Sequence, residues 1–110
     1  MESINVEWTR KASNNIKKIY FFIAQDSQTY ARRFTETLVK KVNAQISSAP
    51  KSGRLVPEFT GTPLFYLREV IFNGYRIIYD PSDSKKATII TVIHGRMDLS
   101  KHINSDWVIE

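Results

Sequence analysis

The dipeptide Asn73-Gly74, placed between two apolar runs, constrains the fold of this chain more than any other feature. A two-residue type I′ turn needs positive φ at both central residues, and asparagine and glycine adopt such angles at the lowest cost. The dipeptide therefore predicts an antiparallel β-hairpin that reverses between Phe72 and Tyr75. Counting outward from the turn then predicts which residues face each other across the two strands.

The two sides of this predicted hairpin differ in chemistry. One side is mainly apolar and aromatic, so we place it against the helices, whereas the other mixes charged and apolar residues, so we expect it to face solvent or a partner. Glu69 and Arg76 are diagonal neighbours on the second side, close enough for a salt bridge. The first side holds the pairs Phe72–Tyr75, Val70–Ile77 and Arg68–Tyr79, and the second holds Ile71–Arg76, Glu69–Ile78 and Leu67–Asp80.

Two amphipathic helices are predicted before the hairpin. Thr9 can cap a helix that runs to about Gln25, and Ser27 can cap a second helix over about Gln28 to Ser47. Because the connection is short, the helices should form an antiparallel pair that packs on the sheet. Their apolar stripes are Ala12, Ile16, Ile19 and Ile23 in the first helix, and Ala31, Phe34, Leu38, Val42 and Ile46 in the second.

Strands are predicted on both sides of these helices. Apolar and polar residues alternate over 4–8, the period of a half-buried strand, and Pro50 stops the second helix. The first strand of the hairpin is expected over Phe65–Phe72, and another apolar run spans Thr88–Ile93. The predicted fold class is α+β: a single two-layer domain over residues 1–110, in βααβββ order, with an antiparallel sheet packed on one face by an antiparallel helical hairpin.

The C-terminal tail, from about residue 98, is left open by the sequence. Asp98–His102 fits a short helix, and Trp107–Ile109 fits either a docked strand or an irregular segment. His102 is expected to be a surface residue.

Composition narrows the chemistry further. A net charge of +5 and a pI near 9.6 favour acidic protein or nucleic acid as a partner. The absence of cysteine excludes disulfides and thiolate chemistry and agrees with a cytoplasmic location. There is no glycine-rich phosphate loop, and two histidines without cysteine make a poor zinc site, so we expect no cofactor and no metal. We expect no signal peptide, and the apolar run 19–24 is too short to span a membrane.

The charged and aromatic residues of the predicted sheet are the candidate binding residues. A charge in an apolar sheet is costly unless it pairs with another charge or holds an anionic partner. Arg76 can pair with Glu69 or bind an acidic partner, and His94 is either an acid–base group near neutral pH or a solvated strand end. The full set of partner-binding candidates is Arg68, Glu69, Arg76, Tyr79, His94 and Arg96.

Five short motifs occur together in this chain. They are Trp8-Thr-x-x-Ala12, Pro50-x-x-Gly53-Arg54-x-x-Pro57-Glu58, Arg68-Glu69, Tyr75-Arg76-Ile-Ile-Tyr79 and Val92-Ile-His94-Gly-Arg96. In this order, over residues 4 to about 98, they resemble the RelE/ParE superfamily of bacterial type II toxin–antitoxin systems. The resemblance implies a small basic toxin that a cognate antitoxin holds inactive, with a disordered acidic segment of the antitoxin wrapped around it.

The superfamily has two activities: RelE-like members cleave mRNA in the ribosome, and ParE-like members inhibit DNA gyrase. The resemblance implies that a RelE-like enzyme has lysines on the strand before the turn. This chain has Leu67 and Glu69 at those positions. The position of a C-terminal tyrosine in that branch falls near His102. Because the lost cations would clamp phosphate and stabilise developing charge, the resemblance favours a ParE-like gyrase inhibitor with no catalytic residue.

Two alternatives stay open at this point. A ribosome-dependent mRNA endoribonuclease would use Arg76, Arg96 and either His94 or His102, without a metal. A non-toxic binding module would retain only the binding of the antitoxin. No recognition helix or base-reading arm is evident, so we expect no specific binding of DNA by the chain alone.

Overall fold

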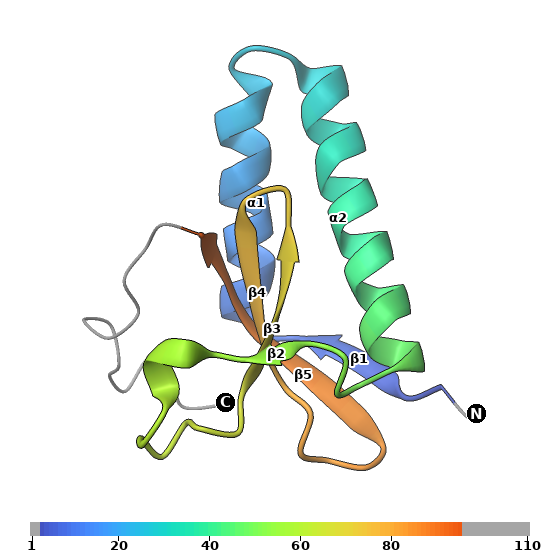
Figure 1. Cartoon of the computed structure of the whole chain (residues 1–110). Helices are drawn as coiled ribbons and strands as arrows, with labels where there is room; N and C mark the ends of the chain where they lie inside the picture. The colour runs from blue at the N-terminus through green and yellow to red at the C-terminus, as the bar shows by residue number, and fades with distance from the viewer. Residues whose placement is uncertain (1–2, 96–110) are drawn as a thin grey trace.

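The computed structural model describes residues 3–95, and these form two helices packed on a five-stranded sheet (Figure 1). The elements are β1 (Asn5–Trp8), α1 (Arg10–Ala24), α2 (Gln28–Ser48), β2 (Arg54–Leu55), the 3₁₀ helix η1 (Pro57–Phe59), β3 (Arg68–Phe72), β4 (Tyr75–Asp80) and β5 (Lys86–His94). The α+β class and the predicted order of helices and main strands are confirmed. The predictions for Arg96, for Asp98–His102 and for Trp107–Ile109 lie outside the described residues.

The sheet differs from the prediction in being mixed. Its strand order is β1-β5-β4-β3-β2, with β5, β4, β3 and β2 antiparallel in succession and β1 parallel to β5. The expectation of an antiparallel sheet therefore holds for the four later strands and is wrong for β1. Asn5 pairs with Lys86, far away in the chain, and no local turn signal reports such a pairing.

The β3–β4 hairpin has the predicted turn and the predicted register. Asn73 and Gly74 both have positive φ, at 45° and 85°, as a type I′ turn requires. All five pairs from Arg68–Tyr79 to Phe72–Tyr75 face each other as counted from the turn. The first strand begins later than predicted, at Arg68, because the backbone before it makes turns such as Leu67 N–H to Leu64 C=O, 3.1 Å.

Both predicted helix caps are present. The Thr9 hydroxyl accepts a hydrogen bond from the Ala12 N–H, and the Ser27 hydroxyl accepts one from the Tyr30 N–H, each at 3.1 Å. The helices lie side by side as an antiparallel pair that projects beyond the β3–β4 turn (Figure 1). No helix within residues 3–95 is long and apolar enough to cross a membrane.

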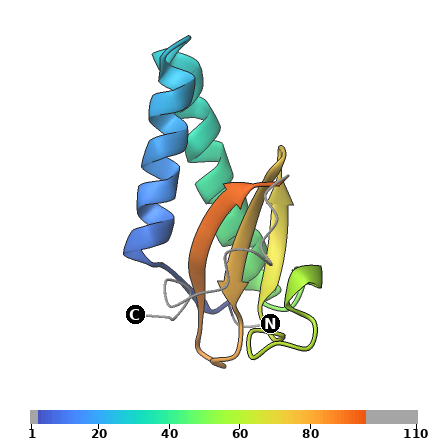
Figure 2. The same ribbon diagram turned by 90° about the vertical axis from the view of Figure 1, so that its left-hand side faces the viewer.

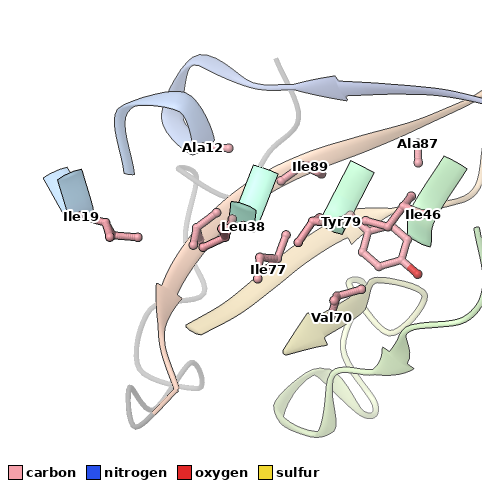
Figure 3. Close-up of a cluster of buried hydrophobic side chains, with 11 residues drawn as sticks. Ala12, Ile19, Leu38, Ile46, Val70, Ile77, Tyr79, Ala87 and Ile89 are labelled. Atoms are coloured by element: carbon pink, nitrogen blue, oxygen red, sulfur yellow. The ribbon is translucent and has the colours of Figure 1, made fainter. Parts of the chain in front are cut away.

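The main core lies between the helices and the sheet (Figure 3). It combines the apolar stripes of both helices with the side of the hairpin that the sequence placed against them. Burial of these side chains is the driving force that makes two individually marginal helices stable. Its buried members are Ala12, Ile19, Leu38, Val42, Ile46, Val70, Ile77, Tyr79, Ala87, Ile89 and Val92.

A second, smaller core covers the opposite side of the sheet. The loop from Val56 to Leu67, which contains η1, folds over that side, and the helices lie on the other (Figure 2). The prediction that the Glu69 side faces solvent or a partner is therefore wrong, since Glu69 is 1% exposed and Arg76 5%. The buried apolar members of this core are Val56, Phe59, Leu67, Ile78 and Ile90.

The turn gives a direct test of the hairpin geometry. Gly74→Ala should lower the free energy of unfolding by about 1–2 kcal/mol, because a Cβ is strained at φ 85° although nothing crowds it. Asn73→Gly is the matched control and should change it by less than about 1 kcal/mol, since Gly-Gly also suits this turn. Urea denaturation measures both, and equal losses for the two variants would contradict the assigned turn.

Candidate functional site

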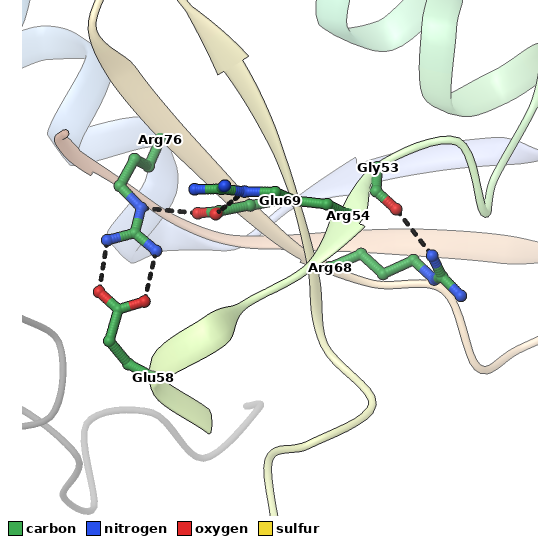
Figure 4. A network of polar contacts seen from close by, with 6 residues as sticks. All are labelled: Gly53, Arg54, Glu58, Arg68, Glu69 and Arg76. Atoms are coloured by element: carbon green, nitrogen blue, oxygen red, sulfur yellow. Dashed lines mark hydrogen bonds and ion pairs between the residues drawn. The ribbon is translucent and has the colours of Figure 1, made fainter. Parts of the chain in front are cut away.

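The most strongly bound charge in the described part of the chain is Arg76 on β4. Its Nε donates to Glu69 Oε1 on β3 at 2.6 Å. Its Nη1 and Nη2 donate to the two carboxylate oxygens of Glu58 in η1, at 2.6 and 2.8 Å (Figure 4). Parallel bonds of this kind are the strong, geometrically specific form of an arginine–carboxylate pair. The guanidinium is thus enclosed between two anions.

Glu69 extends this network to the edge of the sheet. Its second oxygen, Oε2, accepts a hydrogen bond from Arg54 Nε at 2.6 Å, and Arg54 faces Glu69 in the β2–β3 pairing. Two arginines and two glutamates therefore neutralise each other across β2, β3, β4 and η1. No buried side-chain polar atom within residues 3–95 lacks a partner, which is the condition for burying charge on an apolar sheet.

The network ties the Val56–Leu67 loop to the sheet. Glu58 and Phe59 are neighbours in η1, so the ion pair to Arg76 and the burial of the Phe59 ring anchor the same turn. Hydrogen bonding to Glu58 is the main cause that raises the pKa of Arg76 above its ordinary value, while burial acts in the opposite direction. The cation is therefore retained, and its hydrogen-bonding capacity is directed inward.

A second polar cluster holds the segment that follows α2. The buried Tyr79 hydroxyl donates to Pro50 C=O at 2.6 Å and accepts from Gly53 N–H at 3.0 Å. Arg68 Nη1 donates to the carbonyl of Gly53 at 2.7 Å and to that of Lys51 at 3.3 Å. A Cβ on Gly53 would lie 2.6 Å from the Glu69 carbonyl oxygen, so only glycine allows the chain to approach this closely.

His94 lies apart from this network. It stands exposed at the end of β5, opposite Tyr75, with its ring edge-on to the Tyr75 ring at a centroid separation of 5.8 Å. Because side chains alternate across a strand, Tyr75 and Arg76 project to opposite sides of the sheet. The structure therefore does not bring His94 and Arg76 together. Arg96 and His102 lie outside the described residues.

Sequence reasoning missed two members of the buried network, Arg54 and Glu58. Both residues were identified from the sequence only as part of the motif that runs from Pro50 to Glu58, and neither was assigned an ion-pair partner. The proximity of Glu69 to Arg76 was predicted, and it is confirmed at 2.6 Å. Predicting these partners would have required knowing that the Val56–Leu67 loop folds back over the sheet, and the hydrophobic periodicity of the sequence does not indicate this.

The helical pair carries the positive charge of the chain. Eight of the sixteen Lys and Arg residues but only two of the eleven Asp and Glu residues lie between Arg10 and Ser48, so this segment has a charge of +6 and the rest −1. Phe21, Phe22 and Tyr30 stand exposed where the helices meet. No group of three or more metal-binding side chains occurs within residues 3–95.

The chain matches a known protein family over most of its length. The model of the family described as the ParE toxin of the type II toxin–antitoxin system parDE matches residues 6–99, so the chain belongs to this family. It is therefore the toxin component of such a system, and an antitoxin is its partner. No curated protein matches the chain in sequence.

Solved structures share the fold at low sequence identity. The chromosomal ParDE system from P. aeruginosa aligns with a TM-score of 0.66 and 17% identity, over 84% of this chain and 96% of that one. The toxin–antitoxin complex RelBE2 from Mycobacterium tuberculosis aligns with a TM-score of 0.63 and 19% identity, over 86% of this chain and 93% of that one. A mutant of the E. coli toxin RelE in the free state, with two arginines replaced by alanine, aligns with 0.59 and 18%, over 93% of each chain.

The network predicts that replacing Arg76 lowers the free energy of unfolding far more than replacing Arg54 does. Arg76→Ala should lower the free energy of unfolding by about 3–5 kcal/mol, because it leaves two carboxylates beside each other without their shared cation. Arg54→Ala is the control, because this side chain is 61% exposed and Arg76 still pairs with Glu69; the loss should stay below about 1 kcal/mol. Similar losses in urea denaturation would contradict the assigned network.

Tyr79 predicts a pH-dependent contribution to stability. Burial raises the pKa of its hydroxyl, while the Gly53 hydrogen bond and the Arg68 charge act against the rise. The unfolded chain then loses this proton first, so the contribution is complete below about pH 10 and declines as the pH rises further. Tyr79→Phe should cost about 1–3 kcal/mol at pH 7, and less in alkali.

Tyr30→Phe is the matched control for this test. It removes an exposed hydroxyl, and the change should stay within about 0.5 kcal/mol at every pH. A difference between wild type and Tyr79→Phe that does not decrease above pH 10 would refute the assigned role.

Proposed function

We propose that this toxin inhibits DNA gyrase, as a ParE-like member of its family, and that the antitoxin blocks this activity. The observation that carries the proposal is the enclosure of Arg76 between Glu58 and Glu69. Arg76 is the cation that a metal-independent nuclease would need on β4, and each of its three nitrogens already donates to a carboxylate.

Electrostatics oppose RNA cleavage at this place. A scissile phosphate gains negative charge in the transition state and requires cations that are preorganised toward it. Here an approaching phosphate would meet two carboxylates together with their two arginines, a set with no net charge. Releasing Arg76 would also separate Glu58 and Glu69 from the cation that they share, which costs several kcal/mol. Leu67, in place of a lysine, is fully buried in the second core and adds no cation.

The partner-binding residues divide into two roles under this proposal. Glu69, Arg76 and Tyr79 are buried, so they hold the loops that shape the surface and do not themselves reach a partner. Arg68 and His94 lie at accessible positions and are the ones that we propose to contact gyrase or the antitoxin. For Arg96 a contact with a partner stays a prediction.

The antitoxin has a suitable surface in the helical pair. The charge of +6 on residues 10–48 attracts an acidic chain, and the exposed aromatic rings at the tip offer apolar contacts. We expect the complex to cover this pair or the sheet and to bury roughly 1,600 Å² or more, the size of a stable interface.

A supercoiling assay tests the proposal. Purified toxin at micromolar concentration should stop gyrase from supercoiling relaxed plasmid, because occupation of the enzyme blocks its cycle, and prior mixing with the antitoxin should restore supercoiling. Arg54→Ala serves as a folded control and should inhibit like the wild type, since its partner Glu69 stays paired. Unimpaired supercoiling at this concentration would reject gyrase as the target.

A translation reaction with a reporter mRNA separates the alternatives. Frame-dependent cuts in the translated mRNA would favour the ribosome-dependent endoribonuclease instead. If neither supercoiling nor mRNA is affected, and cells grow normally after induction without the antitoxin, the chain is a binding module that has lost its toxicity.

A further inference from the structure

Arg68 differs from the other two arginines of the sheet in its partners. Arg54 and Arg76 form ion pairs with glutamates, whereas Arg68 makes no ion pair within residues 3–95. Within residues 3–95 only its Nη1 is occupied, by the carbonyls of Gly53 and Lys51. Figure 4 shows the bond to Gly53. A guanidinium that is held by neutral carbonyls keeps its charge and its remaining donors for an incoming anion.

A groove of about 420 Å³ opens beside this guanidinium. This volume lies in the range of sites that hold a small ligand or one or two side chains of a peptide. Its walls include Lys51 and Arg68 as cations, and Leu55 and Phe65 as apolar side chains. Leu55 is 51% and Phe65 60% exposed, so the apolar part of the groove is open to a partner.

The position of Arg68 is fixed before any ligand arrives. Arg68 faces Leu55 across the β2–β3 pairing and Tyr79 across the β3–β4 pairing. Gly53, whose carbonyl holds the guanidinium, is in turn held by the Tyr79 hydroxyl. Because these groups are ordered in the free protein, little conformational entropy is lost when an anion binds.

The chemistry of the groove selects one kind of occupant. A carboxylate satisfies Arg68 and Lys51, and an apolar side chain close to it in the same segment covers Leu55 and Phe65. Nucleic acid would satisfy the cations but would leave the aliphatic Leu55 without an apolar contact. The combination therefore favours a protein segment over a phosphate backbone.

We propose that this groove binds a segment of the cognate antitoxin in which an acidic residue lies next to a large apolar residue. The site lies on the edge of the sheet at β2 and β3, beside the segment that follows the C-terminal end of α2. The inference rests on the antitoxin being the partner of this toxin and does not depend on gyrase as the target.

Affinity measurements with the full-length cognate antitoxin as the probe test this site. Arg68→Glu should weaken binding roughly tenfold or more, because it replaces an anchoring cation with a repelling anion. Phe65→Ser, at an exposed position, should also weaken binding roughly tenfold through lost apolar contact, without touching the Arg68 hydrogen bonds. Lys85→Glu makes the same charge change as Arg68→Glu on an exposed residue outside the groove and should change affinity by only about twofold.

Thermal unfolding establishes whether each variant is folded. If Arg68→Glu does not fold, Phe65→Ser still tests the proposal. An antitoxin variant in which the acidic residue that faces Arg68 is replaced by lysine should bind the Arg68→Glu toxin with restored affinity. If folded Phe65→Ser and Arg68→Glu both bind within about twofold of wild type, the proposal is overturned. It is also overturned if these variants lose gyrase inhibition but keep antitoxin affinity, since the groove would then serve gyrase. Failure of the supercoiling assay alone would leave the antitoxin result unaffected.

Discussion

The pairing of one arginine with two glutamates determines how this molecule is organised on one side of its sheet. Arg76 links Glu69 on the neighbouring strand to Glu58 in the loop that covers the sheet, at distances of 2.6 to 2.8 Å. Without the Val56–Leu67 loop, Glu69 and Arg76 would be exposed to solvent, and so would the apolar residues of the second core. With it, the chain gains a second buried layer but gives up a free cation on β4. Each of the three Arg76 nitrogens already donates to a carboxylate, which is why we propose no role for Arg76 as a phosphate ligand.

The surfaces left for partners follow from this arrangement. The network across β2, β3, β4 and η1 pairs two arginines with two glutamates, and the net positive charge lies on the helical pair. Among the sheet arginines that the structure describes, Arg68 is the exception, because backbone carbonyls rather than carboxylates hold it. The two surfaces that we propose for the antitoxin are therefore a broad basic one on the helices and a narrow one beside Leu55 and Phe65. Two modest contacts on one partner chain act together through their effective concentration.

The sequence predicted the features that local geometry controls. The Asn73-Gly74 turn specified the register of β3 and β4, and Thr9 and Ser27 marked where the helices begin, because turns and caps depend on neighbouring residues. Pairings between distant segments escaped prediction. The parallel contact of β1 with β5 and the closure of the Val56–Leu67 loop over Glu69 arise from burial in three dimensions, which periodicity along the chain does not encode. The same limit explains why Glu58 was seen as part of a motif and not as the partner of Arg76.

Nuclear magnetic resonance of the arginine side chains tests the central claim most directly. If Glu58 and Glu69 enclose Arg76, its Nε–H should exchange slowly with water, its Nη protons should give separate signals because rotation is blocked, and both should stay unchanged when a short RNA oligonucleotide is added. Arg33, an exposed arginine of α2 that forms no ion pair within residues 3–95, provides the internal reference with fast exchange. Rapid exchange at Arg76 like that of Arg33, or a shift of its signals on addition of RNA, would show that the cation is available for phosphate and would contradict the account.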